Sequence, residues 1–272
     1  MGKKTTIDWA DASWNPVTGC KHNCVYCYAQ RIASRFAGFD ANEDANRYRY
    51  SITGYAGQNI FTVSEPMTRL TKDGEKQTAV YPFGFAPTLH TYKLNEPQTW
   101  KEPKDIFVCS MADLFGEFIP DNWIQRVFES CAEAPWHRYF FLTKNPRRYI
   151  DLFSKMDKEG KRFPSNYWFG TTVTTPDAEY FFRDDVNCFL SIEPIQSDFP
   201  VDDKPLNDLG IKWIIVGAET GNRVGKIKPR REWVEHIEKT CDKNEIPLFM
   251  KDSIQDLMKR NFRQEKPLAS SN

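Results

Sequence analysis

The sequence predicts an α/β fold, namely a partial or complete parallel (β/α) barrel of six to seven units with a long insertion after the first helix. Short apolar runs that suit buried strands alternate along the chain with amphipathic stretches that suit helices. This alternation is typical of βαβ units, in which the strands pair in parallel. The chain has 272 residues, and barrels of roughly 200–250 residues commonly fold as one domain.

The expected strands are short runs rich in Ile, Val, Phe and Trp. They lie at 106–109, 139–142, 168–173, 188–192, 213–216 and 248–250. A further strand is expected to end at the cysteine motif near residue 20. Helical spacing of apolar residues predicts helices at 28–36, 121–134, 146–156 and 231–242. Pro146 stands at a first helical position, where its missing N–H costs no hydrogen bond.

The stretch 38–103 interrupts the alternation, because it is polar and rich in Gly, Pro, Asn and Tyr. Loops of this length are usually lids, binding loops or disordered segments. We therefore expect one domain over residues 1–263, with an insertion at about 38–103 beside the mouth of the active site. Residues 264–272 are expected to form a flexible tail.

Composition limits the class of protein. The 37 basic and 37 acidic side chains cancel, which gives no sign of a general polyanion binder. No run approaches the roughly 18 apolar residues of a membrane span, and no signal peptide is expected. Seven cysteines are an odd number and do not suggest a disulfide framework. We expect a cytoplasmic protein that does not contact a membrane.

Three cysteines are closely spaced, as Cys20-Lys-His-Asn-Cys24-Val-Tyr-Cys27. Iron–sulfur clusters are normally held by four thiolates. A cluster with three local thiolates keeps one iron open for a substrate or cofactor, much as a catalytic zinc keeps one open position. The alternative is a structural zinc site, which needs four ligands. His22 is the nearest spare ligand and would be strained. The remaining cysteines are scattered at positions 109, 131, 188 and 241.

The cysteine spacing, with Tyr26 just before the third cysteine, resembles the signature of the radical S-adenosylmethionine (SAM) superfamily. The resemblance implies a [4Fe–4S] cluster on Cys20, Cys24 and Cys27, with SAM bound to the open iron. It implies reductive cleavage of SAM to a 5′-deoxyadenosyl radical, which abstracts hydrogen from an unknown substrate. A nucleic-acid base is one candidate substrate, by analogy with similar phage-associated proteins. A one-electron donor of the flavodoxin or ferredoxin type is implied by the same chemistry.

Further motifs resemble a phage-associated, radical-SAM-like family of unknown function, and they span about residues 5–252. These motifs are at 7–20, 105–115, 141–146, 190–194 and 213–221. Many members of that family have a longer gap between the first two cysteines. The Gly-Gly-Glu of many radical SAM enzymes is replaced here by Ser110-Met-Ala-Asp113. The resemblance therefore does not assign the contacts to the SAM amino group.

Polar residues follow the expected strands, where the chemistry of (β/α) barrels is located. We expect cofactor contacts from Tyr26, Ser110, Lys144, Glu193, Gly217 and Glu219. Lys144 suits the SAM carboxylate, the glutamates suit ribose hydroxyls or the substrate, and Gly217 and Gly221 permit close approach of the adenosine. Each role has a structural alternative. Lys144 would then be a surface lysine, Ser110 would stabilise a local turn, and the two glutamates would form structural ion pairs.

Cys109 is the candidate catalytic residue, because a thiol at a strand end can donate a hydrogen atom to a product radical. Another radical SAM enzyme uses a cysteine in this way. The alternative is a small buried core residue, since cysteine is among the most buried residue types.

Two other functions stay open. One is a nucleic-acid-binding module stabilised by zinc or a cluster, without radical catalysis. The basic segment 223–231 is consistent with a phosphate-binding rim, although charge runs are usually solvated faces. The other is a protein of this fold that uses SAM without radicals or has lost turnover.

Overall fold

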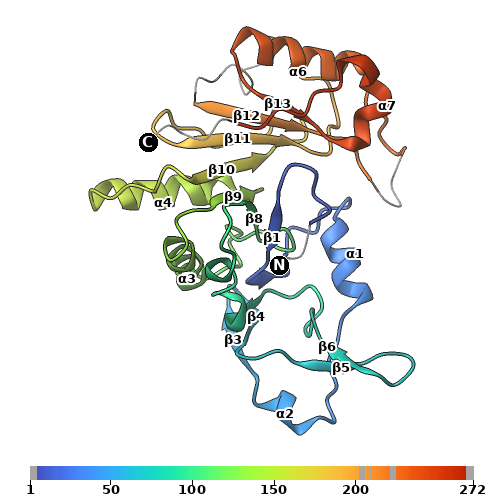
Figure 1. Ribbon diagram of the computed structural model, residues 1–272, viewed down its shortest axis with the longest axis vertical. Helices are drawn as coiled ribbons and strands as arrows, with labels where there is room; N and C mark the ends of the chain where they lie inside the picture. The colour runs from blue at the N-terminus through green and yellow to red at the C-terminus, as the bar shows by residue number, and fades with distance from the viewer. Residues whose placement is uncertain (1–4, 202–205, 207, 209, 221–224, 268–272) are drawn as a thin grey trace.

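The computed structural model describes residues 5–201, 206, 208, 210–220 and 225–267. A seven-stranded sheet forms a half-barrel, with neighbouring strands paired in parallel in the order β1-β8-β9-β10-β11-β12-β13 (Figure 1). The strands are β1 (Ala12–Trp14), β8 (Asp105–Val108), β9 (Arg138–Thr143), β10 (Tyr167–Thr172), β11 (Asn187–Ile192), β12 (Ile211–Val216) and β13 (Leu248–Met250). The predicted partial barrel is confirmed, whereas a complete barrel is not formed, because β1 and β13 are the two edges of this sheet.

Four helices lie close to their predicted positions. They are α1 (Tyr28–Arg35), α3 (Asp121–Ala132), α4 (Pro146–Lys158) and α6 (Arg231–Lys243). The apolar faces of α3, α4 and α6 pack on one face of the sheet and share a core with it. The alternation is incomplete, because the connection 173–186 between β10 and β11 contains turns but no helix. After β13 come η4 (Asp252–Ile254), α7 (Gln255–Met258) and η5 (Lys259–Asn261).

The other face of the sheet is lined by aromatic side chains. Inward-facing residues from successive strands form a separate core, and they are Phe107, Phe140, Trp168, Phe189, Trp213 and Phe249. Trp9 joins them from the segment before β1, with its ring centroid 4.8 Å from that of Phe107 and 5.6 Å from that of Trp213. Large side chains commonly fill the interior of such barrels. Trp9 therefore packs into the interior that the open sheet leaves uncovered.

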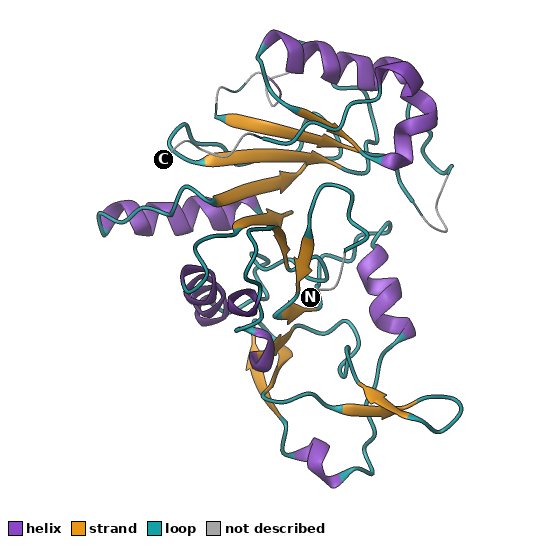
Figure 2. Ribbon diagram, in the orientation of Figure 1, coloured by secondary structure: helices purple, strands orange, loops and turns teal. Residues whose placement is uncertain are grey.

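The chain between α1 and β8, together with β2 from before α1, forms a second layer below the half-barrel (Figure 2). A four-stranded sheet has the order β2-β7-β4-β3, and β5 and β6 form a hairpin. The strands are β2 (Val17–Thr18), β3 (Tyr50–Tyr55), β4 (Gln58–Val63), β5 (Thr68–Leu70), β6 (Lys76–Thr78) and β7 (Thr88–His90). Short helices α2 (Asp44–Arg47), η1 (Thr91–Lys93) and η2 (Pro97–Thr99) complete it. Because β2 lies between β1 and the cysteines, the barrel strand does not run directly into the cysteine loop as the sequence predicted.

The described part of the C-terminal tail is attached to the sheet. Gln264 pairs with Phe249 in an antiparallel bridge, and the backbone N–H of Glu265 donates to the carbonyl of Leu248 at 3.0 Å. Residues 264–267 of the predicted flexible tail are therefore bound, and residues 268–272 lie outside the described ones. All seven cysteines are free thiols. None of the described helices is long and apolar enough to cross a membrane.

Gly170 in β10 is expected to be sensitive to substitution. A Cβ atom there would lie 2.2 Å from Cζ of Phe189, which packs over the glycine in the aromatic interior. We expect Gly170→Ala to lower the free energy of unfolding by about 1–3 kcal/mol, because overpacking a dense core forces side chains to shift. Urea denaturation monitored by tryptophan fluorescence measures this change.

The matched control is Gly54→Ala in the exposed strand β3, where a Cβ atom meets nothing within 4 Å. We expect this control to change stability by less than about 1 kcal/mol. Equal effects of the two substitutions would contradict the packing of Phe189 on Gly170.

Candidate active site at the carboxyl ends of the strands

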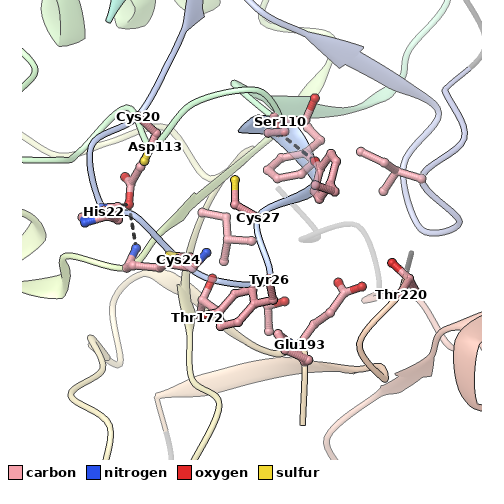
Figure 3. A pocket seen from close by; sticks show the side chains of 18 of the residues that line it. Cys20, His22, Cys24, Tyr26, Cys27, Ser110, Asp113, Thr172, Glu193 and Thr220 are labelled. Atoms are coloured by element: carbon pink, nitrogen blue, oxygen red, sulfur yellow. Dashed lines mark hydrogen bonds and ion pairs between the residues drawn. The ribbon is translucent and has the colours of Figure 1, made fainter. Parts of the chain in front are cut away.

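A cavity of about 380 Å³ opens at the carboxyl ends of the parallel strands. Its size is within the range of small-molecule sites. The polar and charged side chains that line it are Thr6, Cys20, His22, Cys24, Tyr26, Cys27, Tyr28, Ser110, Asp113, Thr143, Lys144, Thr172, Ser191, Glu193, Glu219, Thr220 and Lys251. Apolar walls come from Trp9, Phe85, Phe107 and Leu142. In Figure 3, Cys20, His22 and Asp113 gather on one side, and Glu193 and Thr220 lie on the opposite side.

The cysteine loop is fixed where it leaves β2. Gly19 has φ +89°, and a Cβ atom there would lie 2.2 Å from the backbone oxygen of Ala86. Its N–H donates to the carbonyl of Met111 at 2.9 Å, and the N–H of Cys20 donates to the carbonyl of Phe85 at 3.2 Å. Only glycine fits this close approach without strain. The backbone at Cys20 is therefore held between the second layer and the loop after β8.

The three cysteines of the motif differ from the other four in exposure. Cys20, Cys24 and Cys27 are partly exposed and line the cavity, whereas the remaining four cysteines are buried. Burial raises the pKa of the Cys20 thiol to about 12. Cys27 is the N-cap of α1, and its Sγ accepts a hydrogen bond from the N–H of Gln30 at 3.3 Å. Thiolates are favoured at helix N-termini, so this position suits a ligating sulfur.

Among the described residues, no three His, Cys, Asp or Glu side chains are grouped so as to hold a single metal ion.

Asp113 joins the cysteine loop to the ends of β8 and β9. Its Oδ2 accepts hydrogen bonds from Nε2 of His22 and from the backbone N–H of Lys144, each at 2.8 Å. Its Oδ1 accepts from Oγ1 of Thr143 at 2.7 Å and from the N–H of Phe115 at 3.0 Å. A carboxylate has about four acceptor positions. The carboxylate of Asp113 is therefore saturated by protein donors.

The side chain of Asp113 is only 8% exposed. Burial by itself would raise the pKa of this carboxyl group. The hydrogen bonds and charge of His22, with the donors at Lys144 and Thr143, outweigh burial and lower the pKa below its usual value. Asp113 is therefore ionised at neutral pH, and Nε2 of His22 donates to it.

Opposite charges face each other on the other wall of the cavity. Nζ of Lys251, directly after β13, lies 2.7 Å from Oε1 of Glu193, which follows β11. Nζ of Lys144, directly after β9, lies 5.9 Å from the centroid of the Tyr26 ring.

The hydroxyl of Thr172, at the end of β10, is buried without a hydrogen-bond partner among the described residues. Such a group points to a ligand, because buried polar atoms are rarely left unpaired.

Asn15 organises the loop after β8. Its Oδ1 accepts hydrogen bonds from Oγ of Ser110 at 3.2 Å and from the N–H of Met111 at 2.9 Å. The hydroxyl of Tyr28, in the first turn of α1, donates to the carbonyl of Ser110 at 2.7 Å. Ser110 is therefore positioned by the chain on both sides of the cysteine motif.

The structure brings most of the predicted site residues to this one cavity. The cavity-lining members of the predicted set are Cys20, Cys24, Tyr26, Cys27, Ser110, Lys144, Glu193 and Glu219. Burial raises the pKa of the Tyr26 phenol, which therefore stays protonated. Glu193 also forms the ion pair that we named as an alternative.

Two predicted residues lie away from the cavity wall. Cys109 has φ +60°, is 2% exposed, and packs within the core between the sheet and its helices. Burial raises the pKa of its thiol to about 12. A Cβ atom on Gly217 would lie 3.1 Å from Cδ of Lys251, so this glycine makes room for the lysine side chain. A hydrogen-donor role for Cys109 and an adenosine contact at Gly217 stay predictions. Gly221 and Arg223 lie outside the described residues.

Sequence reasoning underrated several residues. The sequence showed Asp113 only as a polar residue near a strand end and His22 only as a strained fourth ligand of the alternative zinc site. Their hydrogen bond spans 91 positions and therefore leaves no local pattern. Asn15 and Trp9 lie inside the motif at 7–20, but that motif gave neither residue a role. The signal that could have marked Trp9 as a packing residue is its large apolar side chain between the acidic residues Asp8 and Asp11.

Fold and site together define an α/β half-barrel protein with a cysteine-lined cavity at the carboxyl ends of its strands. A family described as protein of unknown function (DUF5131) matches residues 4–267. The chain therefore belongs to this family. No curated protein matches it.

We expect Asp113→Asn to lower the free energy of unfolding at pH 7 by about 1–3 kcal/mol, because an amide group leaves at least one buried donor unpaired. The folded-state pKa of Asp113 is below the unfolded value of about 3.9. Its contribution to stability is therefore full above that value and is lost as the pH falls through the folded-state pKa. Urea denaturation between pH 7 and pH 3 checks the shrinking difference from wild type.

The control is Asp198→Asn, which alters an exposed carboxylate that pairs with His236. We expect this variant to change stability by less than about 1 kcal/mol. A deficit of Asp113→Asn that stays constant at low pH would contradict the assigned ionisation of Asp113.

Proposed function

We propose that this protein is a radical SAM enzyme, in which a [4Fe–4S] cluster supports reductive cleavage of SAM and hydrogen abstraction from a substrate. The observation that carries the proposal is that the three thiols of the CxxxCxxC motif line one cavity with cationic and anionic side chains. The cavity lies where parallel barrels carry their chemistry. We propose a nucleic-acid base as one candidate substrate, by analogy with similar phage-associated proteins.

The donor set suits an iron–sulfur cluster with one open iron. Cys20, Cys24 and Cys27 are free and accessible from the cavity, and thiolates are the usual ligands of such clusters. The raised pKa of Cys20 means that its thiol must lose a proton when metal binds. When bound, the cluster supplies the electron that cleaves SAM and generates the 5′-deoxyadenosyl radical.

The protein's own residues bind and orient the cofactor in this proposal. The ammonium group of Lys144 is an exposed cation on the cavity wall and attracts the SAM carboxylate. Thr172, with its unpaired hydroxyl, and Glu219 offer hydrogen bonds to the ribose. The Lys251–Glu193 pair orients polar groups of cofactor or substrate.

The apolar wall excludes water from the reacting groups. Trp9 and Phe107 line the cavity, and their ring centroids are 4.8 Å apart. A reactive radical needs such a site, because exclusion of water and competing groups prevents side reactions.

We propose a cytoplasmic enzyme that receives electrons from a flavodoxin- or ferredoxin-type donor.

The first test is anaerobic reconstitution of the full chain with iron and sulfide. We expect a brown protein whose dithionite-reduced EPR signal changes when SAM is added, and which releases 5′-deoxyadenosine. Cys24→Ala is expected to abolish the signal and the product. The matched control, Cys131→Ala, removes a buried thiol that belongs to α3, and it is expected to retain both.

Two outcomes would contradict the proposal. A colourless protein with one tight zinc and no deoxyadenosine would instead support a zinc-stabilised binding module. A cluster that binds SAM but gives no deoxyadenosine on reduction would support non-radical use of SAM.

Lys144→Met tests the cofactor site separately from the cluster. Loss of the ammonium group is expected to weaken SAM binding about tenfold, which corresponds to about 1.4 kcal/mol. Equilibrium dialysis with reconstituted protein measures the affinity. Lys161→Met is the control. Lys161 pairs with Glu159 and precedes the amino end of β10, whereas the proposed site lies at the carboxyl ends of the strands. If the two variants bind SAM with equal affinity, Lys144 is not part of the proposed cofactor site.

A further inference from the structure

We propose that Asp113 and His22 are positioning residues that hold the turn between Cys20 and Cys24 in the geometry needed to retain a cluster. This inference rests on the proposed function, because it assigns a role in the same site. Neither residue is proposed as a ligand or as a group that touches the reacting atoms.

The geometry begins with the burial of the carboxylate. Asp113 accepts hydrogen bonds from His22, Thr143, Lys144 and Phe115. The donors other than His22 belong to the loop after β8 and the end of β9, and they fix the carboxylate on the rigid sheet. His22 is the one donor among them that comes from the cysteine loop. The hydrogen bond at 2.8 Å therefore transfers a position set by the sheet to the middle of that loop.

A ring contact adds a second restraint on the histidine. The centroid of the His22 ring lies 5.2 Å from that of Phe118, and the rings meet edge to face. The imidazole thus has one nitrogen on Asp113 and its ring against an aromatic wall. Because the loop has Cys20 two residues before His22 and Cys24 two residues after it, displacement of His22 moves both thiols.

The same carboxylate also fixes the proposed cofactor contact. The N–H of Lys144 donates to the oxygen that accepts from His22. The backbone that carries the Lys144 ammonium group and the loop that carries the thiols therefore share one anchor. We infer that this anchor fixes the position of the three thiols relative to Lys144, the lysine proposed to bind the SAM carboxylate.

A second histidine–aspartate pair offers a matched comparison. Nδ1 of His236 lies 2.8 Å from Oδ1 of Asp198, and these side chains are 31% and 40% exposed. The side chains of His22 and Asp113 are 22% and 8% exposed. Exposed pairs contribute little, whereas loss of a donor to a buried carboxylate is costly. The distance is the same in both pairs, so burial is the difference between them, and we expect only the inner pair to restrain the segment that carries its histidine.

The experiment compares His22→Phe with His22→Gln in the anaerobically reconstituted full chain. Phenylalanine keeps a ring against Phe118 but has no donor for Asp113, whereas glutamine keeps an N–H donor. Outer partners of metal ligands typically change metal affinity about 10–100-fold. We expect His22→Phe to lose iron to a chelator about tenfold faster than wild type and to alter the EPR signal of the reduced cluster. His22→Gln should restore most of both properties, and His236→Phe should match wild type.

Hydrogen exchange in the protein before reconstitution separates this inference from the proposed function. Amide exchange over residues 20–27 is expected to be about tenfold faster in His22→Phe than in wild type and in His236→Phe. If wild type holds no cluster but this exchange difference is found, the proposed function fails and the anchoring of the loop stands. If wild type holds a cluster and His22→Phe retains iron and its EPR signal as wild type does, the positioning role is overturned. Equal loss in His22→Phe and His22→Gln would also overturn it, because the donor would then not matter.

Discussion

The site depends on one buried carboxylate. Asp113 accepts hydrogen bonds from His22 in the cysteine loop, from Phe115 in the loop after β8 and from Lys144 directly after β9. An ionised group at this depth is stable only if its acceptor positions are filled. The same hydrogen bonds that stabilise the carboxylate also fix the segments that supply the donors. A polar network of this kind gives the cavity its shape where apolar packing alone would leave the loops free.

The half-barrel supplies the frame for this network. Parallel strands bring residues distant in sequence to one edge, since each strand ends beside its neighbour. Thr172 ends β10, Glu193 and Lys251 directly follow β11 and β13, and all three line the same cavity. The open sheet leaves its interior incomplete, and Trp9 fills part of it with a ring packed on Phe107. The same segment thus serves the core and the cavity wall.

The position of the cysteine motif follows from the way two layers meet. After β1 the chain leaves the half-barrel, and β2 pairs with β7 in the second sheet. Gly19 passes so close to Ala86 that a side chain has no room. The motif therefore begins at the junction between the half-barrel and the second layer. Cys27 ends it as the N-cap of α1. The three thiols are presented by a loop whose two ends are fixed by backbone geometry.

The sequence by itself determined the barrel strands from β8 to β13 and the helices α1, α3, α4 and α6, because their residue patterns report local burial. It also marked Cys20, Cys24 and Cys27, whose spacing is local, and polar strand-end residues such as Lys144. The tertiary structure decided what depends on contacts between distant segments. It paired His22 with Asp113, placed Cys109 in the core, and formed a second sheet where the sequence showed no periodic pattern. Hydrogen bonds across about ninety positions leave no periodic trace in the sequence, so only the folded chain reveals them.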